Sequence, residues 1–290
     1  MFTYLLLFLV LYTITKHFLN KLRNLPQSPF PALPIIGHLH LLRKPLHRSL
    51  AKISDRYGPV LLLQFGSRPV LLVSSPSAAE ECLTRNDIVF ANRPRLLAGK
   101  HLGNNYTNLT YASYGHHWRN LRRIATVEIL SSHRLQTLAH IRADEVRSLL
   151  RRLARRSAQD QAVEIKPLLF ELMMNNMMRM IAGKRYYGEN VDEGEAGKFE
   201  EMVSDTLRLG GTTNISDFVP LYRWIRGRGY EKSLIELQKK RDGLMQGLIE
   251  ENRKRSNPNE KKNMIEDLLS LQESDPEYYT DDIIRGLMLV

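Results

Sequence analysis

The residues best suited to chemistry in this sequence are a tryptophan and an arginine one helical turn apart. Trp118 and Arg122 lie in the stretch 111–123, where aromatic residues and Gly115 precede the tryptophan. Positions i and i+4 share a helix face, so the two side chains are expected to lie next to each other. An indole N–H beside a guanidinium group suits a carboxylate carried on the edge of a large flat ring. The same spacing also arises when a tryptophan packs inward and an arginine stays in water.

Charge and composition narrow the possible partners. The chain has 290 residues, of which 43% are hydrophobic and 25% charged, and a net charge of +11. These proportions are typical of a globular protein with a core. The window 119–156 carries ten arginines but no lysine and no aromatic residue. Because single-strand binders need aromatic side chains between their basic ones, nucleic acid is not predicted as a partner. A solvated basic face and an acidic protein partner both remain open.

No metal site is predicted from the ligand-type residues. Cys82 is the only cysteine, which rules out a disulfide within the chain and a zinc site built from cysteines. It lies in the expected helix 78–84 without a nearby base, so we expect a buried, inert thiol. His38 and His40 have no third ligand close by.

The first 45 residues predict two segments that precede the folded body. Residues 1–15 carry no charge, and we interpret 1–20 as an uncleaved membrane anchor, with a cleaved signal peptide as the competing interpretation. Lys16, Lys21 and Arg23 follow, which would keep the rest of the chain in the cytosol. Residues 21–45 form a proline-rich strap that we expect to be extended and to lie against the folded body.

The remaining pattern predicts a mainly α fold with a small β-hairpin subdomain. We expect a helix over 46–57 that stops at Gly58, a hairpin of strands 60–65 and 70–73, and a long loop over 86–114. Later helices include a methionine-rich one ending at Gly183, one ending near Gly210, and a long one over 230–255. An apolar helical turn follows Thr280, and we interpret it as the start of a longer core helix, which makes the chain the front part of a longer protein.

Several motifs, in this order, resemble the microsomal cytochromes P450 of plants, in particular the isoflavone hydroxylase-like group. They are Pro34-Ile35-Ile36-Gly37, Tyr57-Gly58-Pro59, Phe90-Ala91-Asn92-Arg93-Pro94-Arg95, residues 114–123, residues 176–188 and Ile215-Ser216-Asp217-Phe218-Val219-Pro220. The resemblance covers all 290 residues. It implies a cytochrome P450 fold truncated at the start of its central oxygen-activating helix, with 46–290 as the front part of the haem-thiolate monooxygenase domain.

The resemblance also implies a cofactor, a reaction and an electron donor. Trp118 and Arg122 match the positions that donate to a propionate of haem b in this family. The implied reaction inserts one oxygen atom from O₂ into a small, aromatic plant metabolite. NADPH supplies the electrons indirectly, through a flavoprotein reductase whose acidic surface would meet the basic face of Arg119, Arg123 and Arg134. The implied location is the endoplasmic reticulum membrane, with the body facing the cytosol.

Some expectations concern the substrate pocket and what the chain lacks. The resemblance points to one set of pocket candidates: Leu102, Tyr106, Tyr111, Leu209 and Thr212. The family's axial thiolate comes from a late loop, and Cys82 has the wrong context for that role. We therefore predict no catalytic residue in this chain and no activity from it alone. The alternative is a truncated, non-catalytic, membrane-bound interaction fragment. The sequence does not specify the substrate.

Overall fold

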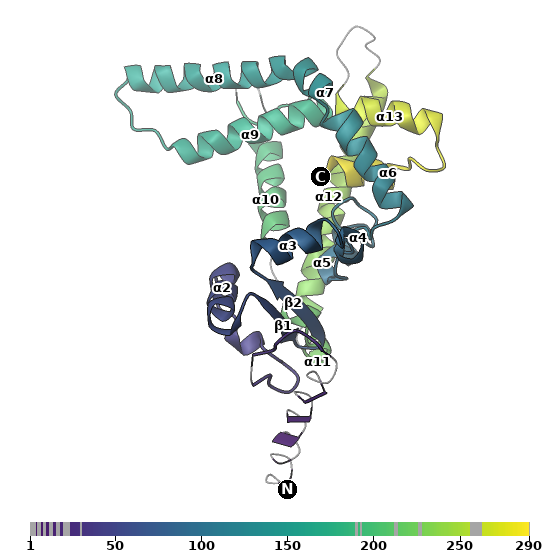
Figure 1. Cartoon of the computed structure of the whole chain (residues 1–290). Coiled ribbons are helices and arrows are strands. Elements are labelled where there is room, and N and C mark those ends of the chain that lie inside the picture. The colour runs from purple at the N-terminus through teal and green to yellow at the C-terminus, as the bar shows by residue number, and fades with distance from the viewer. Residues whose placement is uncertain are drawn as a thin grey trace. The chain divides into compact units, whose positions relative to one another are not determined.

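The computed structural model of this chain is mainly helical, with a two-stranded antiparallel sheet in the part that it describes (Figure 1). It describes residues 24–29, 31–188, 191, 193–211, 214–225, 228–255 and 263–289, and a few isolated positions before residue 20. The chain divides into two compact units. The first unit is Met1–Asn92 with Thr213–Glu231, and the second is Arg93–Thr212 with Lys232–Val290.

The first unit contains the sheet and several short helices. Its elements are η1 (Leu39–Leu41), α2 (Leu46–Tyr57), β1 (Val60–Phe65), β2 (Arg68–Val73), α3 (Pro76–Leu83), α4 (Asp87–Phe90), η3 (Ile215–Asp217) and α11 (Pro220–Ile225). The predicted helix and hairpin are both confirmed, with α2 ending before Gly58, whose φ is +117°. The second strand begins earlier than predicted, so that Pro69 pairs with Gln64 inside the ladder.

The buried face of β1 organises the core of the first unit. Leu61, Leu63 and Phe65 alternate toward the core, as the period of two along a strand requires. Phe65 meets Phe218 edge to face, with ring centroids 5.8 Å apart. Gly66 turns the hairpin at a φ of +55°, and a Cβ there would lie 2.0 Å from the carbonyl oxygen of Phe218. Only glycine fits this turn.

The proline-rich strap lies against β1, as expected, but it is not extended throughout, because η1 (Leu39–Leu41) falls within it. The amide N of Leu62 donates to the carbonyl O of Gln27 at 2.9 Å. The amide N of His38 donates to the carbonyl O of Gln64 at 2.6 Å. The imidazole of His38 is fully buried; its Nδ1 accepts from the Gln64 amide at 2.7 Å, so its Nε2–H donates to the Pro29 carbonyl at 2.7 Å. Both ring nitrogens therefore serve the fold.

The predicted anchor over residues 1–20 falls largely outside the described residues. Within the part of the chain that is described, no helix is both long and apolar enough to cross a bilayer.

The second unit is built from helices. They are α5 (Leu97–His101), α6 (His116–Ile124), the π-helical turn η2 (Ala125–Ile129), α7 (Ser132–Thr137), α8 (Ala139–Ala158), α9 (Ile165–Ala182), α10 (Glu193–Gly210), α13 (Met264–Ser274) and α14 (Asp281–Met288), with most of α12 (Arg228–Lys254). The predicted end of the methionine-rich helix at Gly183, in a left-handed conformation, and the predicted long helix are confirmed.

The predicted loop over 86–114 differs from the structure, because it contains the short helices α4 and α5. Leu97, Ala98 and Gly99 of α5 are buried. A helix of five residues is not stable by itself, so tertiary packing determines this one and no local pattern could reveal it.

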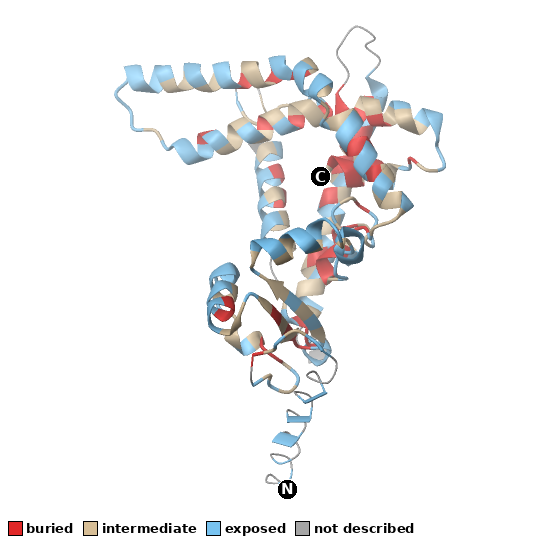
Figure 2. Ribbon diagram, viewed as in Figure 1, coloured by how far each residue is buried: buried red, intermediate tan, exposed pale blue. Residues whose placement is uncertain are grey.

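The core of the second unit reaches the last described turn. Most of the side chains in this unit that are less than 2% exposed come from α6, α12, α13 and α14, and Tyr186, after α9, is another; Figure 2 shows buried segments in red. In α14, Ile284, Leu287 and Met288 are at most 4% exposed. The apolar turn after Thr280 therefore packs within this unit. Thr280 occupies the N-cap position, although its side chain makes no capping hydrogen bond.

Candidate functional site

Helix α6 carries the two residues singled out in the sequence. Leu121 and Ile124 are buried and fix one face of the helix in the core. Trp118 is half-buried and Arg122 is exposed. The guanidinium carbon of Arg122 lies 5.2 Å from the centroid of the Trp118 ring, so the two side chains are adjacent, as their spacing predicts. The ring of Tyr114 supports the tryptophan from the preceding turn, with centroids 5.6 Å apart.

The donor groups of this pair are available to a ligand. Neither the indole N–H of Trp118 nor the guanidinium of Arg122 has a hydrogen bond or ion pair with any residue that the structure describes. The neighbouring Arg123, in contrast, donates to the side chain of Asn120 at 3.1 Å. A guanidinium stacked on an indole, with its N–H groups unused, fits one carboxylate of a planar group. The residues present therefore fit the propionate edge of a haem.

A histidine that the sequence analysis did not identify positions the start of α6. The Nε2 of His117 lies 2.7 Å from the carbonyl O of Thr107, to which it donates. Its Nδ1 lies 2.9 Å from the hydroxyl of Tyr278, which must then be the donor. One side chain thus connects α6 to the preceding loop and to the turn before α14. Hydrogen bonds to residues far along the chain leave no sequence signal.

Three of the predicted pocket residues lie together in the second unit. A Cβ placed on Gly99 would come within 2.8 Å of the Tyr106 ring and 2.9 Å of the Tyr111 ring, so both rings pack directly on this glycine. Leu102 is buried next to them, and its carbonyl O accepts from the Nη1 of Arg241 at 3.2 Å.

Burial shapes the electrostatics of this cluster. It raises the pKa of Tyr111, and the nearby charge of Arg241 offsets part of that rise. Burial also lowers the pKa of Arg241. Leu209, on α10, is buried as well, and the adjacent Gly210 approaches Leu102. Thr212 lies outside the described residues.

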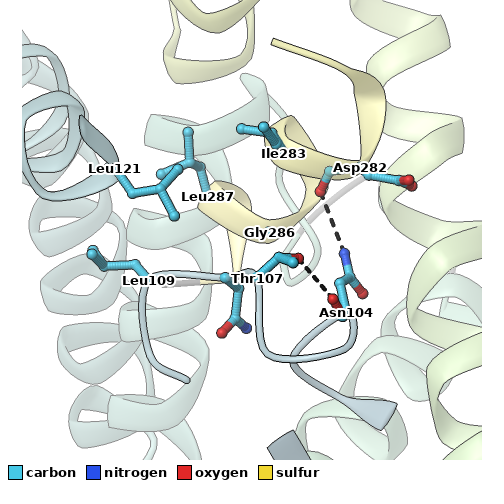
Figure 3. A pocket seen from close by; sticks show the side chains of 9 residues that line it. Asn104, Thr107, Leu109, Leu121, Asp282, Ile283, Gly286 and Leu287 are labelled. Carbon is cyan, nitrogen blue, oxygen red and sulfur yellow. Dashed lines mark hydrogen bonds between the residues drawn. The ribbon is translucent and has the colours of Figure 1, made fainter. Parts of the chain in front are cut away.

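A small cavity lies between the loop over 104–109 and α14 (Figure 3). Its volume of about 10 Å³ has room for about one water molecule and not for a substrate. The side-chain Nδ2 of Asn104 donates to the carbonyl O of Asp282 at 3.4 Å and so links the loop to the helix. None of the five pocket candidates lines this cavity, and their role stays a prediction.

The basic face expected to meet a partner is only partly available. Arg119 and Arg123 are exposed. Arg134 differs from the expectation, because it forms an ion pair with Asp267 of α13 and its side chain is only 15% exposed. A guanidinium that is both paired with a carboxylate and largely covered offers little attraction to an acidic surface.

The burial of Cys82 differs from the expectation. It is half-buried on α3, so the predicted buried thiol is wrong in this respect. Among the described residues, no group of three histidine, cysteine or acidic side chains is placed to hold a metal ion.

A buried carboxylate in the second unit also escaped the sequence analysis. Glu145 of α8 is 3% exposed and accepts hydrogen bonds from Arg179 at 2.6 Å, from Arg185 at 2.5 Å and from the side chain of Asn175 at 3.1 Å. Burial alone would raise the pKa of Glu145, but the hydrogen bonds from Arg185 and Arg179 outweigh it and hold the pKa below its usual value. The network joins α8, α9 and the turn that follows α9.

Comparison with known proteins identifies the family to which this chain belongs. The family model for cytochrome P450 matches residues 26–290. The chain belongs to the cytochrome P450 family. The expected fold class, mainly helical with a small antiparallel sheet, is confirmed.

Curated plant relatives show the same membership in more detail. The chain is 52% identical to cytochrome P450 81Q32 of Catharanthus roseus, over 93% of the chain and 54% of that protein. It is 48% identical to isoflavone 2'-hydroxylase of Glycyrrhiza echinata, over 99% of the chain and 57% of that protein. It is 46% identical to isoflavone 3'-hydroxylase of Medicago truncatula, over 93% of the chain and 55% of that protein. The chain therefore spans about half the length of the curated relatives it matches.

Proposed function

We propose that this chain is part of a haem-dependent monooxygenase that inserts one oxygen atom from O₂ into a small, aromatic plant metabolite. The observation that carries the proposal is the Trp118–Arg122 pair, two adjacent donors whose N–H groups have no hydrogen-bond or ion-pair partner among the described residues. Membership of the cytochrome P450 family supplies the reason to assign these donors to haem b.

In this proposal the residues of α6 hold the cofactor by its edge. Arg122 would neutralise a propionate and donate to it, and the indole N–H of Trp118 would be the second donor to the propionate edge. Tyr114 keeps the indole in place, and His117 fixes the start of the helix. The haem, when bound, supplies the oxygen-activating chemistry, and this part of the chain orients it.

The proposed substrate is a flavonoid or another phenylpropanoid-type aromatic. Two of the relatives are named as isoflavone hydroxylases, which supports this class without specifying the molecule. Leu102, Tyr106, Tyr111 and Leu209, with Thr212, remain the candidates for contacting it. The first four are apolar or aromatic, which suits a planar aromatic molecule.

The proposed electron donor is a flavoprotein reductase that oxidises NADPH. Arg119 and Arg123 are the exposed cations that an acidic surface could meet, whereas Arg134 is already paired. The proposed location is the endoplasmic reticulum membrane, held by residues 1–20, with the body in the cytosol. The support is the uncharged apolar sequence of residues 1–15.

We further propose that residues 1–290 alone do not catalyse this reaction. The thiolate ligand of the family comes from a cysteine in a late loop, whereas Cys82, the only cysteine in the sequence, lies on the early helix α3. Helix α9 also exposes an apolar stripe, one residue per turn, with side chains 42% to 55% exposed: Ile165, Leu169, Met173 and Met177. Such a stripe belongs against another helix.

Haem titration of purified protein tests the cofactor assignment. In the complete reading frame that contains this chain, Arg122→Ala should lower haem content at least several-fold, because the propionate loses its charged partner. Arg123→Ala removes the same charge from the same helix and should leave haem content unchanged. Equal haem content in the two variants would contradict the role of Arg122.

The 290-residue chain by itself provides the second test. Reconstituted with haem, reduced and exposed to CO, it should show no thiolate-type shift of the Soret band. A shifted band would show that Cys82, the only cysteine in the sequence, supplies a thiolate ligand, and would contradict the proposal that these residues are inactive alone.

A further inference from the structure

Helix α8 borders a groove that is lined mainly by arginine side chains. Helices α8 and α9 lie side by side (Figure 1), and the groove lies between α8 and the turn that follows α9. Five guanidinium groups line it: Arg147, Arg151, Arg152, Arg155 and Arg185. Its volume is about 260 Å³. Neither the haem site nor the basic face of Arg119 and Arg123 includes any of these residues.

The spacing of the arginines makes a row along the helix. Arg147, Arg151 and Arg155 stand four residues apart, so they share one face of α8. At 1.5 Å per residue, the row extends over about 12 Å. Arg151 has no hydrogen bond or ion pair with any residue that the structure describes.

Carboxylates hold several of these guanidinium groups in fixed positions. Arg147 pairs with Asp144 at 2.9 Å, and Arg152 pairs with Glu171 at 2.6 Å. Arg185 is fixed by the buried Glu145. A guanidinium has five N–H donors, so an arginine held by one carboxylate still has N–H groups to offer a ligand. Three carboxylates, Asp144, Glu171 and Glu145, therefore pair with arginines of the groove, and the five guanidinium groups still outnumber them.

The size of the groove selects a compact anion. Drug-sized ligands occupy sites of about 300–1,000 Å³, and this groove is smaller. Phosphate oxygens accept pairs of parallel hydrogen bonds from guanidinium groups, and a row of arginines can engage neighbouring phosphates. Arg155 also has a simpler explanation: it lies at the C-terminal end of α8, where a cation stabilises the helix dipole. Arg156 is also in the last turn of α8 but does not line the groove. A comparison of the two residues therefore distinguishes helix stabilisation from ligand binding.

We propose that this groove is a binding site for a ligand with two neighbouring phosphate groups. A soluble diphosphate and a phosphorylated lipid headgroup share this chemistry. The proposal adds a site to the chain that is independent of the haem assignment.

Calorimetric titration of the purified chain with inorganic pyrophosphate tests the site. Arg151→Ala should weaken the affinity at least tenfold. Arg156→Ala, with the same change of charge on the same helix, should change it less than about threefold. Equal losses in both variants, or no heat of binding in the wild type, would overturn the proposal.

Vesicles distinguish the two sources of phosphate. Co-sedimentation with phosphatidylcholine vesicles, with and without phosphatidylinositol 4,5-bisphosphate, whose headgroup carries two neighbouring phosphates, should show an Arg151-dependent increase if the ligand is a lipid headgroup. Binding of pyrophosphate without that increase would indicate a soluble ligand. If an acidic polyglutamate peptide binds more tightly than pyrophosphate and is equally sensitive to Arg151→Ala, the site serves an acidic protein and the phosphate proposal is wrong.

A measurement on the wild type avoids dependence on folded variants. Phenylglyoxal modifies accessible guanidinium groups, and mass spectrometry of the peptides locates the modification. Pyrophosphate should protect Arg151 and Arg155 and leave Arg156 reactive. Uniform protection, or none, would contradict a defined site.

Discussion

The buried carboxylate of Glu145 gives the sharpest test of how the second unit is held together. Changing Glu145→Gln keeps the shape but removes the charge that two arginines share. Removing one partner from a buried ion pair costs about 3–5 kcal/mol, because the remaining charge is left uncompensated. Since the side chains of Arg179 and Arg185 are 23% and 35% exposed, water relieves part of this penalty. We therefore expect a loss near the lower limit, about 3 kcal/mol.

Urea unfolding followed by circular dichroism measures this loss, and hydrogen exchange in peptides of α8 and α9 locates it. Glu171→Gln is the matched control, because Glu171 pairs with Arg152 at 2.6 Å on a more exposed surface. Exposed pairs contribute up to about 1 kcal/mol. A Glu145→Gln variant no less stable than Glu171→Gln would refute the assignment of Glu145 as the central acceptor.

The pH dependence provides a second criterion for Glu145. Its pKa is lowered in the folded protein, so its contribution is complete above the ordinary glutamate pKa, about 4.3. That contribution is lost as the pH falls through the depressed folded-state pKa. The difference between wild type and Glu145→Gln should therefore be constant above about pH 5 and shrink in more acidic solution. A difference that is independent of pH down to pH 3 would contradict the ionised carboxylate.

Other substitutions test the hairpin and the helix ends. Gly66→Ala should destabilise the first unit by more than about 2 kcal/mol, because the Cβ would meet the Phe218 carbonyl at a positive φ. Gly115→Ala, in extended backbone with open space around it, is the tolerated control in the same thermal unfolding assay. Asn263→Ala should cost about 1 kcal/mol, measured by urea unfolding, because it removes the capping box with Glu266. Asp281→Asn should lower the free energy of unfolding at pH 7 and have little effect in strong acid, as measured by urea unfolding. The reason is that hydrogen bonds from Arg253 hold the pKa of Asp281 below its usual range. Equal effects at both pH values would contradict this.

Local sequence patterns predicted many helix ends and the hairpin correctly. The helix over 46–57 stops where Gly58 permits a positive φ, and the methionine-rich helix stops at Gly183 for the same reason. These signals depend on the residue itself and its nearest neighbours. The short helices α4 and α5 were missed, because packing rather than propensity stabilises them.

The partners of charged side chains could not be predicted from the sequence. Arg134 was expected to face a partner protein, but Asp267, far along the chain, neutralises it. Glu145 gave no sign of being buried, because its three donors come from residues 30 to 40 positions away. The sequence of an arginine-rich window gives the amount of positive charge, but only the packing of the helices determines which arginines pair with carboxylates and which remain available to a partner.

The sequence by itself determined that Trp118 and Arg122 are adjacent, because helical periodicity brings positions i and i+4 together wherever the helix forms. Its ordered motifs also determined the family. Only the tertiary structure decided that the N–H groups of this pair have no hydrogen-bond or ion-pair partner among the described residues. It also decided that Arg134 pairs with Asp267 and that the apolar turn of α14 is buried. The reason is physical: periodicity is a property of neighbouring residues, whereas partnership and burial depend on segments that only the fold brings into contact.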